Sequence, residues 1–249
     1  VAGFKLAPTG NRVAVWSAIP RACAEFGCPA PTASPEEAKA TGREYDEYFV
    51  RHWTSWRTPG VYNRIFAFDV ANGKVPGLGT PLDGSITGNA PTDPFGGGEE
   101  LNWSTDGNTL YYTLREANAM EPRSTDLDIY AAAADGSRLD NLTDANQATD
   151  TMPTPSPDGR YLAYAAMARP GYESDRLVLM LRDLASGTTQ ALTQAWDRSV
   201  GSIAWAPDSS HLIVTAGDTL DHPAYMIALD GTVIRLTQRG NVGDVIPMA

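Results

Sequence analysis

Short apolar runs alternate with turn sequences along the whole chain. Four segments share one pattern, a turn rich in Pro, Asp and Gly followed at once by an apolar run: LAPTGNRVAV (6–15), WSTDGNTLYY (103–112), PSPDGRYLAY (155–164) and WAPDSSHLIV (205–214). In such a turn proline presets φ, Asp or Asn binds its own backbone, and glycine accepts the left-handed conformation. The apolar run after each turn predicts a strand that is buried on one or both faces.

Each unit then carries a second apolar strand and a second turn. These are IFAFDVANG (65–73), IYAAAADG (129–136), LMLRDLASG (179–187) and MIALDG (226–231). A Leu-Thr pair follows each of the last three. The equivalent turn positions Gly107, Gly159 and Ser209 lie 52 and 50 residues apart. That period is typical of the four-stranded blades of a β-propeller.

We therefore expect an all-β chain of about four antiparallel four-stranded blades, over residues 1–94, 95–149, 150–198 and 199–249. The first blade is longer than the others by an insertion at 18–60. Four blades can close a small ring. However, the repeat starts and stops on innermost strands, and an open arc leaves sheet edges unpaired. This phase favours an arc of a larger ring, cut from a longer chain.

The insertion holds the two cysteines and the one predicted helix. The helix is expected to start at Ser34, with Pro35 at its first position and Glu37 completing a capping box, and to run toward His52. Cys23 and Cys28 lie five residues apart with no second cysteine pair or histidine cluster nearby, which argues against a metal site. A disulfide in an exported protein is the preferred interpretation, and two reduced thiols in a cytosolic loop are the alternative.

Charge and motifs narrow the possible functions. The chain has 19 Lys plus Arg against 30 Asp plus Glu, a net charge of −11, which argues against nucleic acid and anionic membranes as partners. No apolar run approaches the roughly 18 residues of a membrane span. The sequence lacks the metalloprotease, P-loop, dinucleotide and EF-hand motifs, so we expect no cofactor and no metal. It also lacks the G-x-S-x-G nucleophile elbow, so we expect no catalytic residue in this chain.

Five segments resemble one family: EYFVRHWTSW (47–56), GGEELNWSTDG (97–107), MARPGYESDR (167–176), DLASGTTQALT (183–193) and IAWAPDSSHL (203–212). Together they resemble the propeller domain of bacterial dipeptidyl peptidases of type V. These enzymes belong to the prolyl oligopeptidase clan of serine peptidases, which also includes acylaminoacyl peptidases. The RHW and GYESD segments carry most of the resemblance, because the PDG turns also occur in TolB-like propellers.

The resemblance implies an arc of a seven- or eight-bladed propeller whose parent protein also has a C-terminal α/β-hydrolase domain with a Ser-Asp-His triad. Such proteins are typically exported to the bacterial periplasm, where they release dipeptides from peptide N-termini. The implied role of this chain is to gate and position a short peptide for that hydrolase domain, with a homodimer as a further expectation. The alternative is a stand-alone TolB-like propeller that binds protein partners.

Holding the free amino terminus of a peptide requires carboxylates, since an unpaired buried ammonium is strongly penalised. Glu99 and Glu100 precede an innermost strand, so we expect them near a mouth of the channel. Tyr172, Glu173 and Asp175 lie in a loop between two strands of one blade and form the second candidate set. The structural alternatives are solvated edge charges for the first pair and ion pairs with nearby arginines for the second set.

Other aromatic and basic residues are expected to be structural. Trp103 and Trp205 occupy the same position of the repeat and predict contacts between blades. Arg51, His52 and Trp53 are also expected to be structural, with Trp53 and Trp56 closing the insertion over its blade.

Overall fold

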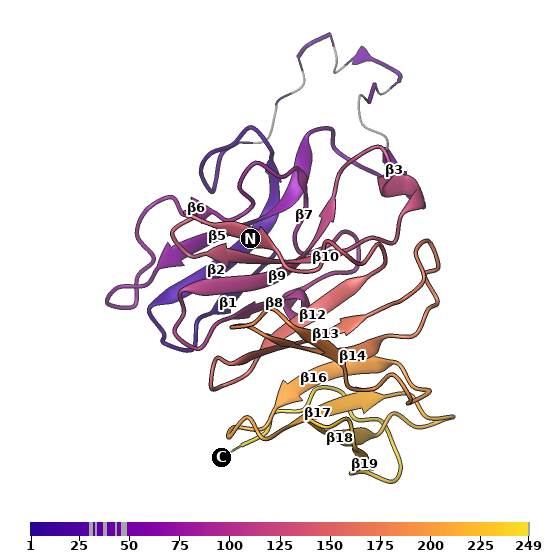
Figure 1. The fold of residues 1–249 in the computed structure, drawn as a ribbon. Helices are drawn as coiled ribbons and strands as arrows, with labels where there is room; N and C mark the ends of the chain where they lie inside the picture. The colour runs from indigo at the N-terminus through magenta and orange to yellow at the C-terminus, as the bar shows by residue number, and fades with distance from the viewer. Residues whose placement is uncertain (30–31, 33, 37–38, 43, 46–48, 249) are drawn as a thin grey trace.

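Four antiparallel sheets follow one another along the chain (Figure 1). The computed structural model describes residues 1–29, 32, 34–36, 39–42, 44–45 and 49–248. The first sheet has the order β1-β2-β5-β6, from strands β1 (Gly3–Leu6), β2 (Arg12–Pro20), β5 (Val61–Asp69) and β6 (Thr80–Pro81). A separate two-stranded hairpin, β3 (Arg51–His52) and β4 (Ser55–Trp56), lies in the long connection between β2 and β5.

The second sheet is built around β9, which pairs with three strands. Its members are β7 (Gly88–Asn89), β8 (Leu101–Trp103), β9 (Thr109–Glu116), β10 (Asp128–Ala133) and β11 (Leu139–Asn141). The short 3-10 helices η2 (Gly98–Glu100) and η3 (Glu121–Arg123) lie before β8 and after β9. Strand β7 lies within the stretch expected for the first blade, but it pairs with β9 of the second sheet.

The third and fourth sheets each keep sequence order from edge to edge. The third consists of β12 (Asp150–Pro155), β13 (Tyr161–Ala166), β14 (Val178–Asp183) and β15 (Thr189–Ala191). The fourth consists of β16 (Val200–Trp205), β17 (His211–Ala216), β18 (Ala224–Ala228) and β19 (Val233–Arg235). The first strands contact one another in succession, β1 with β8, β8 with β12 and β12 with β16, so the sheets diverge from a shared axis. This is the architecture of a β-propeller with four-stranded antiparallel blades.

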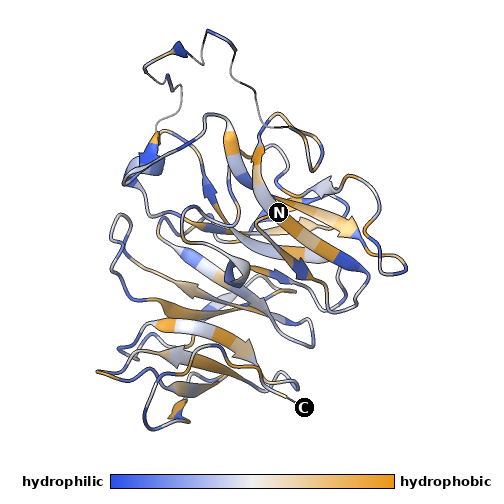
Figure 2. Ribbon diagram, turned by 180° about the vertical axis from the view of Figure 1, so that it is seen from behind, coloured by the Kyte–Doolittle hydropathy of each residue, from blue (hydrophilic) through white to orange (hydrophobic). Residues whose placement is uncertain are grey.

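Alternation along each strand supplies a buried face to both neighbouring sheets. Tyr112 packs with residues of the first sheet, whereas the adjacent Tyr111 packs with Leu162 and Tyr164 of the third. Ala163, between those last two, faces the fourth sheet. Because side chains alternate across a strand with a period of two, a strand between two sheets must be apolar at successive positions. Figure 2 shows the resulting apolar strands and polar connections.

Equivalent positions of the repeat make equivalent hydrogen bonds. The indole Nε1–H of Trp103 donates to the carbonyl oxygen of Lys5 at 2.9 Å, and that of Trp205 donates to Thr154 at 2.9 Å. Both tryptophans are buried. Each therefore ties the first strand of its sheet to the first strand of the sheet before it, which confirms the contacts predicted for these two residues.

The threonine of the Leu-Thr pair also repeats its role. The Oγ1 atoms of Thr143, Thr193 and Thr237 each accept a hydrogen bond from the first or second backbone N–H of the third strand in their own sheet, at 2.9, 2.8 and 3.0 Å. This bond satisfies a buried donor at the end of the strand, where the ladder alone leaves it without a partner.

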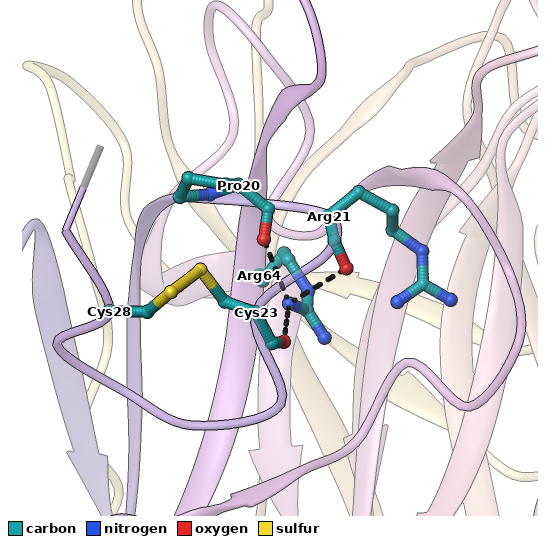
Figure 3. Close-up of a disulfide and its surroundings, with 5 residues drawn as sticks. All are labelled: Pro20, Arg21, Cys23, Cys28 and Arg64. Atoms are coloured by element: carbon teal, nitrogen blue, oxygen red, sulfur yellow. Dashed lines mark hydrogen bonds between the residues drawn. A yellow bond between two sulfur atoms is a disulfide. The ribbon is translucent and has the colours of Figure 1, made fainter. Parts of the chain in front are cut away.

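A disulfide joins Cys23 and Cys28 in the connection after β2, with an S–S distance of 2.09 Å (Figure 3). The loop is held by Arg64 of β5, which is 2% exposed. Its Nη1 donates to the carbonyl oxygens of Pro20 and Cys23 at 3.2 and 2.6 Å, while Nη2 donates to Asp83 at 3.0 Å. The buried guanidinium is thus paired with a carboxylate and hydrogen-bonded to carbonyl oxygens, as a buried charge must be to offset its loss of hydration.

The stretch predicted to be helical differs from the expectation. Glu37, part of the predicted capping box, lies outside the described residues. Of the described residues between Ser34 and His52, Pro35 and Glu36 form a turn, Arg51 begins β3, and none lies in an α-helix. Capping signals alone do not stabilise a short helix, which depends on packing an apolar face, and the described positions near Ser34 are exposed.

Candidate functional site

Connections from three successive sheets meet at one cleft. Each joins the second strand of a sheet to the third, so all leave the sheets at the same end: 21–60 in the first, 117–127 in the second and 167–177 in the third. They line a cleft of about 590 Å³. Its walls include Arg51–Trp53 and Gly171–Ser174, so the two segments that carry most of the family resemblance lie together although they are far apart in the sequence.

Asp175 fixes the loop that carries Tyr172 and Glu173. Its carboxylate accepts hydrogen bonds from the backbone N–H groups of Ala168 and Arg169 at 2.9 and 2.8 Å, and it pairs with the Arg169 guanidinium at 2.8 Å. These bonds, the Arg169 guanidinium first, lower the pKa of Asp175. The structure therefore gives Asp175 a positioning role, which is the ion-pair alternative raised from the sequence.

Tyr172 and Glu173 are exposed residues of this loop. The guanidinium carbon of Arg169 lies 4.0 Å from the centre of the Tyr172 ring, which is 47% exposed. Glu173 is exposed and lines the cleft. The backbone N–H of Gly171 donates to Thr125 Oγ1 at 2.9 Å, which docks the loop onto the second sheet. A rigid loop thus presents one carboxylate to the cleft.

A buried carboxylate joins the insertion to the second sheet beside the cleft. Glu121 is 5% exposed, and its Oε1 lies 3.5 Å from Arg57 Nη1 and 3.8 Å from Arg115 Nε. The ring of Phe49 lies 5.5 Å from each of these two guanidinium carbons. This arrangement anchors Phe49 and Arg115, two of the lining residues.

Aromatic rings gather at one edge of the cleft, where His52 and Trp53 line it and Phe95 lies against them. The rings of His52, Trp53 and Phe95 contact one another, with centroid distances of 4.8 Å for His52 to Trp53, 5.7 Å for His52 to Phe95 and 5.4 Å for Trp53 to Phe95. Trp53 is 74% and Trp56 51% exposed. The expectation that these tryptophans close the insertion over its blade is therefore wrong, because more than half of each side chain is exposed to solvent.

The structure places the first pair of predicted site residues outside the cleft. Glu100 is 6% exposed and accepts hydrogen bonds from Thr92 N and Thr92 Oγ1 at 2.7 and 2.8 Å. Burial raises its pKa to about 7. Glu99 is exposed. Burial of Lys5 lowers the pKa of that lysine, and the negative charge of Glu99 partly opposes this lowering. Glu100 is thus engaged within the chain, and Glu99 faces solvent.

Sequence reasoning missed a second acidic group beside the cleft. A pocket of about 290 Å³ is lined by Glu116, Asp126, Asp128 and Asp144, and it shares Arg115 and Ser124 with the cleft. Burial, followed by the charge of Asp128, raises the pKa of Asp126 to about 6. The only sequence signal was the acidic D-L-D run before the strand at 128–133. Within the described part of the chain, no three His, Cys, Asp or Glu side chains are arranged to hold a metal ion.

Comparison with known proteins gives the relationship of the whole chain. No family model matches it. Dipeptidyl-peptidase 5 of Porphyromonas gingivalis is 31% identical over 244 residues, which cover 96% of this chain and 34% of that protein. The chain is homologous to part of dipeptidyl-peptidase 5. It spans about a third of the length of the dipeptidyl-peptidase 5 relatives that it matches.

Solved structures agree on the fold at low sequence identity. TolB of Acinetobacter baumannii superposes with a TM-score of 0.53 at 12% identity, covering 95% of this chain and 44% of that chain. Dipeptidyl peptidase 4 of P. gingivalis superposes with a TM-score of 0.53 at 13% identity, covering 96% of this chain and 32% of that chain. The fold is therefore shared by a peptidase and by TolB.

Proposed function

We propose that this chain is the non-catalytic propeller of an exported serine exopeptidase, and that it gates and positions peptides whose N-terminal dipeptides the enzyme releases. Its partners are then a hydrolase domain of the same protein and the peptide itself. The similarity to dipeptidyl-peptidase 5 supports this proposal, and so does the share of that protein, about two thirds, that lies outside the match. We further propose that the four sheets are an arc of a larger ring.

The cleft between the first three sheets is the observation that carries the proposal. Its lining includes the exposed side chains of Glu173, Arg51 and Arg123. Arg115 also lines it, but its guanidinium is engaged by Glu121. The amino end of a peptide presents an ammonium group followed by carbonyl oxygens. A carboxylate matches the first, and guanidinium donors match the second. Side chains of both signs in one cleft thus suit the end of a peptide better than a simple anion or cation.

The disulfide supports an exported location, because disulfides persist in oxidising compartments such as the periplasm. The described residues contain no helix long and apolar enough to cross a membrane.

The test is Glu173→Gln in the full-length protein. We expect kcat/KM to fall about tenfold for a dipeptidyl arylamide with a free amino terminus, since a charge-assisted hydrogen bond of about 1.5 kcal/mol is lost. The same substrate with an acetylated amino terminus should be unaffected, because it has no ammonium group to bind. Glu25→Gln removes an exposed carboxylate that does not line the cleft and serves as the matched control. Equal losses on both substrates would remove Glu173 from amino-terminus binding.

The second candidate is a stand-alone propeller that binds protein partners, as the fold similarity to TolB allows. It predicts no peptidase activity in the native protein that carries this chain. The sequence similarity to dipeptidyl-peptidase 5 favours the first candidate.

A further inference from the structure

Trp53 is held in an unfavourable backbone conformation. It has a φ of 48° in the two-residue turn between β3 and β4. Turns of this kind favour Gly, Asn or Asp, and a bulky residue there is an outlier that costs free energy. Strain of this sort persists where the surroundings enforce it, and it marks positions with a functional constraint. Because a tryptophan at this position destabilises the turn, stability of the hairpin does not explain why it is there.

The ring of Trp53 is fixed but remains uncovered. His52 and Phe95 hold it through the ring contacts described above, yet Trp53 is 74% and Phe95 71% exposed. A rigid exposed aromatic pair offers a large apolar contact area at little cost in conformational entropy, as aromatic residues do in binding sites.

The other aromatic rings of the cleft are already engaged. Phe49 lies between the Arg57 and Arg115 guanidinium groups, and the Arg169 guanidinium lies over Tyr172. Trp53 lines the same cleft as Glu173 and supplies exposed apolar surface there. Phe95 does not line the cleft, but its exposed ring lies against Trp53 and extends that surface. We name Trp53 and Phe95 the aromatic rim.

We propose that the aromatic rim binds the side chain of the N-terminal residue of the peptide and selects for apolar, above all aromatic, residues there. This inference rests on the proposed function. The ammonium group and the side chain of an N-terminal residue are attached to the same carbon atom. A residue whose ammonium group reaches Glu173 must therefore place its side chain within the same cleft, where the rim is the apolar surface available to it.

The test compares Phe-Ala and Gly-Ala arylamides on the full-length protein carrying Trp53→Asn. Asparagine accepts the left-handed conformation, so the turn is kept while the ring is removed. We expect kcat/KM for the Phe-Ala substrate to fall about tenfold and that for Gly-Ala to stay within twofold of wild type. Phe95→Ala should also lower the ratio of kcat/KM for Phe-Ala to kcat/KM for Gly-Ala, because the Phe95 ring lies against Trp53. Trp56→Ala is the matched control, since Trp56 is an exposed tryptophan of the same hairpin that does not line the cleft.

The outcomes separate this inference from the proposed function. If Trp53→Asn leaves the ratio of kcat/KM for Phe-Ala to kcat/KM for Gly-Ala unchanged, the aromatic rim does not bind the side chain. This holds even where Glu173→Gln still distinguishes free from acetylated substrates. Equal losses on the Phe-Ala and Gly-Ala substrates also overturn the inference, because they show that the ring contacts the rest of the protein and not the peptide. If Glu173→Gln affects free and acetylated substrates equally, Glu173 does not bind the amino terminus. The Phe-Ala to Gly-Ala ratio in Trp53→Asn still decides whether the aromatic rim binds a side chain.

Discussion

Glu100→Gln tests whether this residue is a buried structural carboxyl and not a ligand for substrate. Burial raises the pKa of Glu100 from 4.5 to about 7. A group whose pKa is raised on folding favours the protonated folded state, so its contribution to stability is full below pH 4.5 and is lost as the pH rises to about 7. At about 1.4 kcal/mol per pKa unit, the wild-type protein loses roughly 3 kcal/mol of unfolding free energy over this range through Glu100.

The glutamine variant should not show this loss. Its side-chain oxygen can accept from Thr92 N and its amide can donate to Thr92 Oγ1, so both partners of the carboxyl group stay satisfied. The assay is urea denaturation of both proteins at pH 5 and pH 8. We expect similar unfolding free energies at pH 5 and a variant that is more stable by roughly 3 kcal/mol at pH 8.

Comparing the two proteins isolates Glu100 from other carboxyl groups. Asp150, whose pKa burial raises to about 8, contributes to the pH dependence of both proteins alike. Glu99→Gln is the control, because its charge is the smallest of the causes that act on the pKa of Glu100. A stability difference between wild type and Glu100→Gln that is the same at both pH values would show that the pKa of Glu100 is not raised on folding.

Two further predictions concern the core of the first sheet. Arg64→Met should destabilise the protein by about 3–5 kcal/mol in urea denaturation, because it leaves Asp83 buried without its main partner, and Asp83→Leu added to it should recover much of the loss. Replacing Cys23 and Cys28 together by serine should cost roughly 2 kcal/mol, as expected for a short closed loop. In a thermal melt, a reductant should lower the Tm of the wild type toward that of the serine variant and leave the variant unchanged.

The strands could be predicted from the sequence because their signals are local. The turn at Gly159 and the alternation after it act over a few residues, and the repeat multiplies that signal across the sheets. The shared position of Trp103 and Trp205 indicated contacts between sheets, since a large aromatic at a fixed place in each repeat needs a fixed partner surface.

The site could be predicted only in part, because it is made by loops from different sheets. The sequence indicated Glu173, but not that Arg51–Trp53 would lie in the same cleft, since no spacing rule brings an insertion of one sheet beside a loop two sheets further on. The sequence made Glu100 a candidate near a channel mouth, with a solvated edge charge as the alternative. Its burial could not be predicted, because it depends on hydrogen bonds with Thr92, eight residues earlier. For Asp175, the sequence left open whether it contacts the substrate or forms an ion pair with a nearby arginine, and the structure shows the ion pair with Arg169.

Labelling of the native protein distinguishes a peptidase from a stand-alone binding propeller. An antibody raised against this chain recovers that protein, which is then treated with a fluorophosphonate that labels activated serines and run on a gel. We expect a labelled band much heavier than the 26.7 kDa of this chain. An unlabelled band at the mass of the chain itself would contradict the peptidase and leave a binding propeller.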